Sequence, residues 1–124
     1  MSFIQELSGD IVQTFTSAVV TYIRSTTPVD LIVNVKNDFD WVNPLTPATS
    51  SNAGNCDILA EIVDGTGTTV VNSAQIEPGQ EKTLIASSVQ FLQITGVSCP
   101  SGPSSANSFF LQTNGSYSGF ITTL

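Results

Sequence analysis

The sequence has no histidine and only three lysine and arginine residues among its 124 residues. Proton transfer and nucleophilic catalysis near neutral pH depend on histidine, on an activated lysine or thiolate, or on paired carboxylates with shifted pKa values. The sequence also lacks a Gly-x-Ser-x-Gly motif that would hold a serine nucleophile. We therefore predict no enzymatic activity, no catalytic residue and no bound cofactor.

Charge of either sign is scarce, since charged residues make up 10% of the chain against a usual share of about 25%. The net charge of −7 argues against nucleic acid and anionic membrane surfaces, which are bound by clustered lysine and arginine. No stretch approaches the roughly 20 apolar residues that a membrane span requires. Residues 1–10 carry Glu6 and Asp10 without a basic cluster, so we expect neither membrane insertion nor a secretory signal.

Serine, threonine and β-branched apolar residues are abundant, and the apolar residues recur with a period of two. This pattern predicts β-strands rather than helices. The expected strands lie in residues 11–23 (one strand or two that meet at a bulge), 29–37, 57–64, 68–75, 81–87, 89–96, 108–113 and 117–123. About eight short strands in a chain of this length predict an all-β, single-domain β-sandwich or jelly roll over residues 11–124, with residues 1–10 as an N-terminal arm outside it.

Turn residues separate several of these strands. Asp64 and Gly65 predict a hairpin, and Pro78 with Gly79 predicts a type II turn in which glycine supplies the positive φ. The nearly continuous run from 81 to 96 is expected to bend at Ser87 and Ser88. Asn114 and Gly115 predict a second hairpin near the C-terminus.

The two cysteines, Cys56 and Cys99, are both flanked by loop residues. We favour an intrachain disulfide between them, while two free thiols or a bond between subunits are the alternatives. In the chain-entropy model, closing this loop stabilises the fold by roughly 4 to 5 kcal/mol.

Residues 38–55 read as a long irregular loop that contains Trp41, Pro44 and Pro47. Trp41 is either an exposed contact residue or a structural plug over one end of the sandwich. Asp38 and Asp40 offer oxygen ligands, but no glycine-centred loop or terminal glutamate completes a calcium site, so we predict no metal.

Apolar strands with few charges leave sheet edges that are poorly protected against pairing. Strand addition between identical subunits is heterologous, and it closes into a ring or propagates into a filament. We therefore predict a homopolymer or ring, in which Phe3, Ile4 and Leu7 of the arm contact a neighbouring subunit. The alternative is that these three residues cover the core of their own subunit.

Two stretches carry a resemblance to a known family. ILAEIVDGTGTTVVNSAQIEPGQEKTLIASSVQFLQITG (residues 58–96) and GSYSGFITTL (residues 115–124) resemble the core of the endospore appendage subunits of spore-forming bacilli. The resemblance implies a jelly-roll subunit whose N-terminal arm reaches into a neighbour, which builds a pilus-like fibre on the spore or cell surface. It also implies that other appendage subunits are partners.

The sequence departs from the family pattern at the positions of the crosslinking cysteines. Residues 1–10 contain no cysteine, and Phe120 occupies the place where the resemblance implies a core cysteine. Arm contacts in this chain would therefore be apolar rather than covalent.

Two other function classes stay open. A carbohydrate- or receptor-binding β-sandwich would use Trp41, Tyr22 and Tyr117 as stacking surfaces. A phage virion structural or decoration protein would share the all-β fold and the symmetric assembly.

Overall fold

The computed structural model describes residues 3–14, 19–38, 56–97 and 112–123. Every regular element in these ranges is a β-strand. The strands are β1 (Phe3–Thr14), β2 (Val20–Asn37), β3 (Asp57–Val63), β4 (Val70–Ile76), β5 (Glu81–Val97) and β6 (Gln112–Thr123). The predicted all-β class is confirmed.

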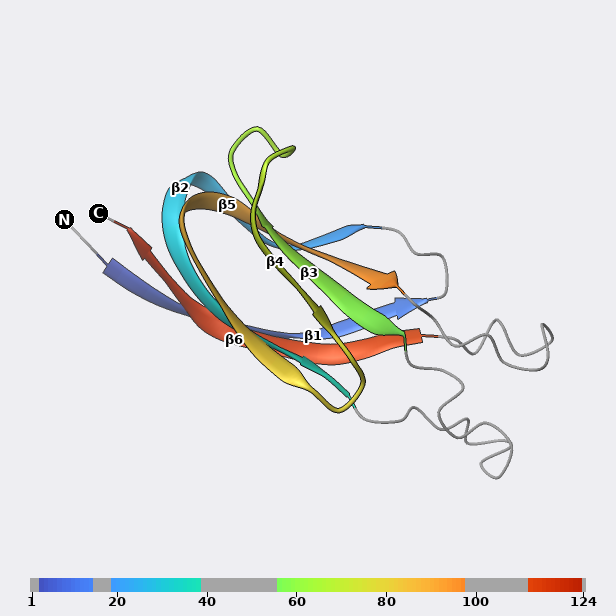
Figure 1. Ribbon diagram of the computed structural model, residues 1–124. Coiled ribbons are helices and arrows are strands. Elements are labelled where there is room, and N and C mark those ends of the chain that lie inside the picture. The colour runs from blue at the N-terminus through green and yellow to red at the C-terminus, as the bar shows by residue number, and fades with distance from the viewer. Residues whose placement is uncertain (1–2, 15–18, 39–55, 98–111, 124) are drawn as a thin grey trace, which may run out of the picture.

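The six strands form one antiparallel sheet in the order β1-β6-β2-β5-β3-β4, and the two longest strands, β2 and β5, arch over together (Figure 1). Their register shifts between Arg24 and Val29 and again before Leu31. Ser88, opposite this region in β5, has a φ of 57°, which is rare for a residue other than glycine. The predicted bend at Ser87 and Ser88 is therefore confirmed.

This arch folds the sheet into two facing layers. The first layer contains β1, β6, residues 30–37 of β2 and residues 81–86 of β5. The second layer contains residues 20–24 of β2, residues 91–97 of β5, β3 and β4. The strand count is six rather than about eight, partly because β2 and β5 each serve both layers as continuous strands.

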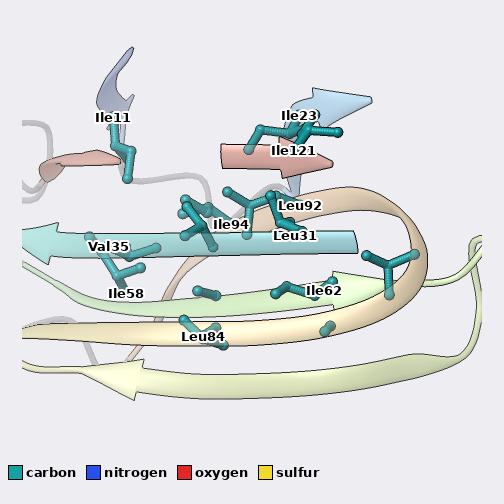
Figure 2. Packing of buried hydrophobic residues seen from close by; sticks show 14 of the residues in the cluster. Ile11, Ile23, Leu31, Val35, Ile58, Ile62, Leu84, Leu92, Ile94 and Ile121 are labelled. Carbon is teal, nitrogen blue, oxygen red and sulfur yellow. The ribbon is translucent and has the colours of Figure 1, made fainter. Parts of the chain in front are cut away.

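The core lies between the layers and is built by every second residue of each strand (Figure 2). In β2, Leu31, Val33 and Val35 are buried, whereas the intervening Ile32 and Lys36 are exposed. The same alternation buries Ile58, Ala60, Ile62, Leu84, Leu92, Ile94, Ile11 and Ile121. Burial of an aliphatic side chain of this size contributes about 1.5 to 3 kcal/mol, so this alternation fixes which face of each strand points inward.

Two of the predicted turns are confirmed. Asp64 N donates to Thr69 O (3.1 Å), and β3 and β4 pair on either side of this turn as a hairpin. At the second turn, Gln80 N donates to Glu77 O (3.0 Å), and Gly79 has a φ of 84°. Positive φ at the third residue is the reason that a type II turn favours glycine there.

The predicted hairpin at Asn114 and Gly115 is wrong, because both residues lie inside the continuous strand β6. Gly115 is paired with Ile11 on one side and with Asn37 on the other. A Cβ atom on Gly115 would collide with the carbonyl oxygen of Lys36. Glycine here permits a close approach of two backbones, a role that the sequence does not distinguish from a turn.

The predicted boundary between arm and domain, at residue 10, falls within β1. Residues 3–14 pair with β6 of the same chain, from Phe3 opposite Thr123 to Thr14 opposite Gln112. Residues 3–10 therefore form a sheet strand in this structure rather than a free arm. The apolar run at residues 11–23 is divided between β1 and β2, which pair with different neighbours.

Candidate assembly surfaces

Among the described strands, the sheet has more unpaired edges than its two end strands. β1 and β4 are terminal in the strand order. In addition, residues 20–24 of β2 pair with no described strand other than β5, because β6 pairs with β2 from Asp30 to Asn37. Residues 81–86 of β5 pair with no described strand other than β2, because β3 pairs with β5 from Phe91 to Val97. Each layer thus ends in two strand segments whose outer backbone groups face away from the sheet.

Hydrogen bonds between the layers show that these edges lie in two groups. Gln13 Nε2 in β1 contacts Tyr22 Oη in β2 at 3.4 Å. We call β1 together with residues 20–24 the β1 side. Asn72 Nδ2 in β4 donates to Ile85 O in β5 (3.1 Å). We call β4 together with residues 81–86 the β4 side.

The two sides differ in charge. The β1 side carries the carboxylates of Glu6 and Asp10 and the guanidinium of Arg24. On the β4 side, β4 itself (Val70–Ile76) has no charged residue, while β5 begins with Glu81 and Lys82. Contact between two β1 strands would oppose like charges on Glu6 and Asp10, which disfavours pairing of a β1 side with another β1 side.

The β4 side has part of its hydrogen-bonding capacity in use. Besides the Asn72 bond to Ile85 O, Lys82 Nζ donates to Gln75 O (2.8 Å). These contacts tie the two layers together at this side. Val70 and Val71 of β4 are 43% and 46% exposed, so apolar surface accompanies the edge.

The outer face of the first layer carries further exposed apolar side chains. Phe120, Ile32 and Ile85 are 46%, 44% and 63% exposed. They lie side by side across β6, β2 and β5, because Ile32 is paired with both Phe120 and Ile85. This row, which we call the apolar row, crosses the outer face of the layer from β6 in its interior to the edge segment of β5.

Comparison with solved structures identifies a shared fold. A subunit of the disulfide-linked pili that form Bacillus endospore appendages matches with a TM-score of 0.61 and 13% identity, over 98% of this chain and 88% of that one. The chain resembles the endospore appendage subunits. Two capsid structures of infectious bursal disease virus, a VP2 subviral particle and the Gt strain, match 98% of this chain but only 32% of their own lengths, with TM-scores of 0.39 and 0.34. No protein-family model matches the sequence, and no curated protein is similar to it.

The three residues predicted to form arm contacts, Phe3, Ile4 and Leu7, all lie in β1. Phe3 begins β1. Ile4 is 72% exposed, whereas Leu7 packs against the core of its own chain. For Leu7 the structure therefore agrees with the alternative prediction, in which these residues cover their own subunit.

Of the two cysteines, only Cys56 lies within the described residues. Cys56 is buried and disulfide-bonded, and no cysteine in the described ranges is a free thiol. Cys99 lies outside the described residues, so its pairing with Cys56 stays a prediction. Trp41, Asp40 and the rest of the loop at 39–55 also lie outside them.

The two tyrosines predicted to form a stacking platform instead pack against each other. The rings of Tyr22 and Tyr117 meet edge to face with centroids 5.7 Å apart, and Tyr117 Oη lies 3.5 Å from Tyr22 O. Both rings are partly buried against the core. They link β2 to β6 between the layers, so these two rings do not form the exposed stacking surface that the alternative of a carbohydrate- or receptor-binding module would use.

One buried polar residue joins several segments of the chain by hydrogen bonds, a role that the sequence did not predict. Asn37, at the end of β2, is completely buried. Its Nδ2 donates to Cys56 O and to Ile76 O, both at 2.9 Å. Its backbone N donates to Gln80 O (2.9 Å), and its carbonyl accepts from Gly79 N (3.0 Å).

The described residues also bear on metal and membrane binding. No group of three or more acidic, cysteine or histidine side chains in the described ranges is arranged to hold a metal ion. The described part of the chain contains no helix that is long and apolar enough to cross a bilayer.

Proposed function

We propose that this protein is a self-assembling structural subunit of a proteinaceous fibre or ring on a spore or cell surface, with a non-enzymatic role. The fold shared with an endospore appendage subunit supports this proposal. The observation that carries it is the set of strand segments, at both sides of the sandwich, whose outer edges have no strand partner within the described part of the chain. Unpaired N–H and C=O groups on such segments form a template for pairing with another chain.

In this proposal, the β1 side of one copy meets the β4 side of the next. Such a contact is heterologous, so each subunit keeps one free side and the chain of subunits continues until it closes or remains a filament. The alternative contact, in which two β1 sides meet, would bring Glu6 and Asp10 of both copies together. The β4 side, where the Lys82 ammonium balances the Glu81 carboxylate, repels those carboxylates less than a second β1 strand would.

N-terminal contacts form a second part of the proposal. Because β1 is paired with β6 of its own chain, the N-terminal residues do not act as a free arm. Besides the outer backbone groups of β1, they offer a neighbour only the side chains that point outward. Ile4, with 72% of its surface exposed, is the residue that we expect to touch a neighbour. Leu7 already contacts its own core and is not expected to participate.

A pair of variants separates strand addition from packing through the face of the sheet. Ile85 and Ile32 are directly opposite each other on the same outer face, but Ile85 lies on an edge segment and Ile32 on an interior one. Ile85→Lys introduces a charge at an edge, which natural sheets use to prevent pairing. We expect Ile85→Lys to abolish fibres or rings in negative-stain micrographs, while Ile32→Lys assembles as the unmodified protein does.

Light scattering after gel filtration gives the mass of each variant in solution. A lone particle of the unmodified protein at high concentration would overturn the proposed function. Equal loss of assembly in both variants would instead show that copies pack through the face of the first layer, and strand addition would be wrong.

A further inference from the structure

Two neighbouring rows of side chains on the outer face of the first layer differ sharply in chemistry. The apolar row contains Phe120, Ile32 and Ile85, and Glu6 follows Phe120 on β1. The next row, two residues along each strand, contains only uncharged polar side chains: Ser8, Ser118, Asn34 and Thr83. An apolar strip therefore runs beside a strip of hydroxyl and amide groups.

An open groove of about 290 Å³ lies where the two rows meet. One wall is apolar and is formed by Phe120 and Ile32. The other wall is polar and is formed by Ser118, Asn34 and Thr83, and Glu6 lines the groove at its β1 end. A concave surface with apolar contacts and a few convergent polar groups has the general character of a small-ligand site.

The backbone beneath the middle of this groove, in β6 and in residues 30–37 of β2, is already paired on both sides. β6 is paired with β1 on one side and with β2 on the other, and residues 30–37 of β2 lie between β6 and β5. A peptide strand laid in the groove would find no backbone partners for its own N–H and C=O groups, which carry most of the affinity in strand addition. The groove therefore suits a ligand that is recognised by side chains alone.

Those side chains offer both donors and acceptors. Asn34 Nδ2 donates to Thr83 Oγ1 (3.1 Å), which fixes the orientation of the amide and directs its carbonyl oxygen away from Thr83. A hydroxyl group both donates and accepts hydrogen bonds, and an amide and a carboxylate add further acceptors. Ser118 and Thr83 are exposed, so their hydroxyls are accessible to a ligand.

The charge of the groove and of the chain further restricts which ligands can bind. Glu6 at the groove and a net charge of −7 on the whole chain repel anionic ligands. What fits is a neutral molecule with an apolar face and a rim of hydroxyl groups, and a pyranose ring has both. We propose that the groove binds a neutral saccharide: Phe120 stacks on the C–H face of a sugar, Ser118 and Asn34 bond its hydroxyls, and the Glu6 carboxylate accepts from adjacent hydroxyls at the end of the groove.

This binding function is separate from assembly. Strand addition through the β1 and β4 sides uses the edges and leaves the face of the first layer open. A fibre built in that way would display one groove per subunit, and weak sites repeated along a polymer gain avidity from multivalency.

The proposal is tested by titrating the full chain with cellohexaose, chitohexaose and mannohexaose, with a sulfated heparin oligosaccharide as the anionic comparison. Calorimetry measures affinity, and amide NMR shifts locate the contact. At least one neutral oligosaccharide is expected to bind and to shift residues 34, 83 and 118, while the heparin oligosaccharide does not bind. Phe120→Ala is expected to weaken binding about tenfold or more, since an aromatic stacking surface is lost.

Two further variants test whether binding takes place in the groove. Ser118→Phe fills the groove without removing Phe120 and is expected to abolish binding. Phe91→Ala removes an aromatic ring from the outer face of the second layer, where it lies 5.6 Å from the Arg24 guanidinium, and is expected to leave binding unchanged. Circular dichroism confirms that each variant is folded.

Several outcomes would overturn the saccharide proposal: no binding of any neutral oligosaccharide, binding of the heparin oligosaccharide alone, or equal effects of Phe120→Ala and Phe91→Ala. If Phe120→Ala changes the mass of the assembly in solution and no sugar binds, then this face contacts another copy instead. The three saccharide results leave strand addition untouched, whereas a change in the mass of the assembly with Phe120→Ala would also count against it. The Ile85→Lys and Ile32→Lys pair tests strand addition separately.

Discussion

Asn37 connects more segments of the molecule than any apolar residue of the core can. Its amide donates to the start of β3 and to the end of β4, and its backbone bonds the turn between β4 and β5. Within the described residues its Oδ1 has no hydrogen-bond partner. The contribution of the Asn37 side chain to the free energy of folding therefore comes from its two Nδ2 hydrogen bonds. These bonds satisfy carbonyls that are buried away from water.

Replacement of Asn37 by alanine should be costly. Asn37→Ala leaves the carbonyls of Cys56 and Ile76 without their donor, and we expect the free energy of unfolding to fall by about 3 kcal/mol. Asn34→Ala is the matched control, because it removes the same side chain from a more exposed position, where the expected loss is below about 1 kcal/mol. Urea denaturation measures both values, and equal losses would contradict this account of Asn37.

Asp64 organises the turn between β3 and β4 through hydrogen bonds to its carboxylate. Thr66 Oγ1 donates to Asp64 Oδ1 (2.6 Å), and Thr66 N donates to the same oxygen (3.1 Å). The side-chain bond from Thr66 is the main reason that the pKa of Asp64 is lowered from its ordinary value. Because these bonds favour the charged form, they stabilise the fold above the ordinary pKa and are lost as pH falls through the lowered one.

The pH dependence of stability should therefore change when Asp64 is neutralised. We expect Asp64→Asn to lower the melting temperature slightly at pH 7 and to make stability less sensitive to acid between about pH 5 and pH 2. Thr66→Val, which removes the donor hydroxyl, should have the same two effects. Thermal melts across this pH range test the idea, and parallel curves for all three proteins would refute it.

At the scale of elements, β6 shows where local sequence signals fail. Asn114 and Gly115 have the composition of a hairpin turn, yet they lie in the middle of a strand between β1 and β2. The local propensity of this dipeptide is outweighed by two sets of backbone hydrogen bonds, which depend on partners far away in the sequence. By contrast, Pro78 and Gly79 lie in the expected turn, because its geometry is set by four consecutive residues.

The close contact of Gly115 with the Lys36 carbonyl leads to a prediction about side-chain size. Gly115→Ala places a methyl group against backbone that is paired on both sides, and we expect a loss of about 1 to 3 kcal/mol from overpacking. Ser118→Ala, an exposed change in the same strand, should cost less than about 0.5 kcal/mol. If chemical denaturation shows that Gly115→Ala is as stable as the unmodified protein, then the two backbones do not approach as closely as described.

The period-two pattern predicted most strand positions, because burial imposes that pattern residue by residue. It did not predict that residues 3–10 join β6 of the same chain. The local sequence around Ile4 and Leu7 favours strand pairing, but it does not distinguish a partner strand in the same subunit from one in a neighbour. The tyrosine contact was likewise missed, because Tyr22 and Tyr117 meet only after the sheet has folded over.

At the scale of the whole molecule, a Cys56–Cys99 bond would tie the start of β3 to the segment that follows β5. We expect that peptide mapping under non-reducing conditions finds this pair joined within one chain. Reduction, or Cys56→Ser, should then lower the free energy of unfolding by about 4 kcal/mol in the chain-entropy model. Recovery of two free thiols, or of a bond between chains, would refute the intrachain bond.

The sequence alone could not locate the apolar row, the polar row beside it or the segments that form the edges, and all three share one reason. Each is created by register between strands that are distant in the sequence, such as Ile32 with Phe120 and with Ile85. The candidate surfaces thus emerge from the topology, whereas the scarcity of charge that leaves the edges unprotected is visible in the composition.

Amide hydrogen exchange of the assembled protein, compared with the dispersed Ile85→Lys variant, tests strand addition most directly. The account predicts that peptides covering residues 20–24, β1, β4 and residues 81–86 gain protection on assembly, because their outward backbone groups acquire partners. Peptides covering β3, which is paired on both sides in a single copy, should be protected equally in both samples. Edge peptides that exchange at the same rate in assembled and dispersed protein would contradict the account.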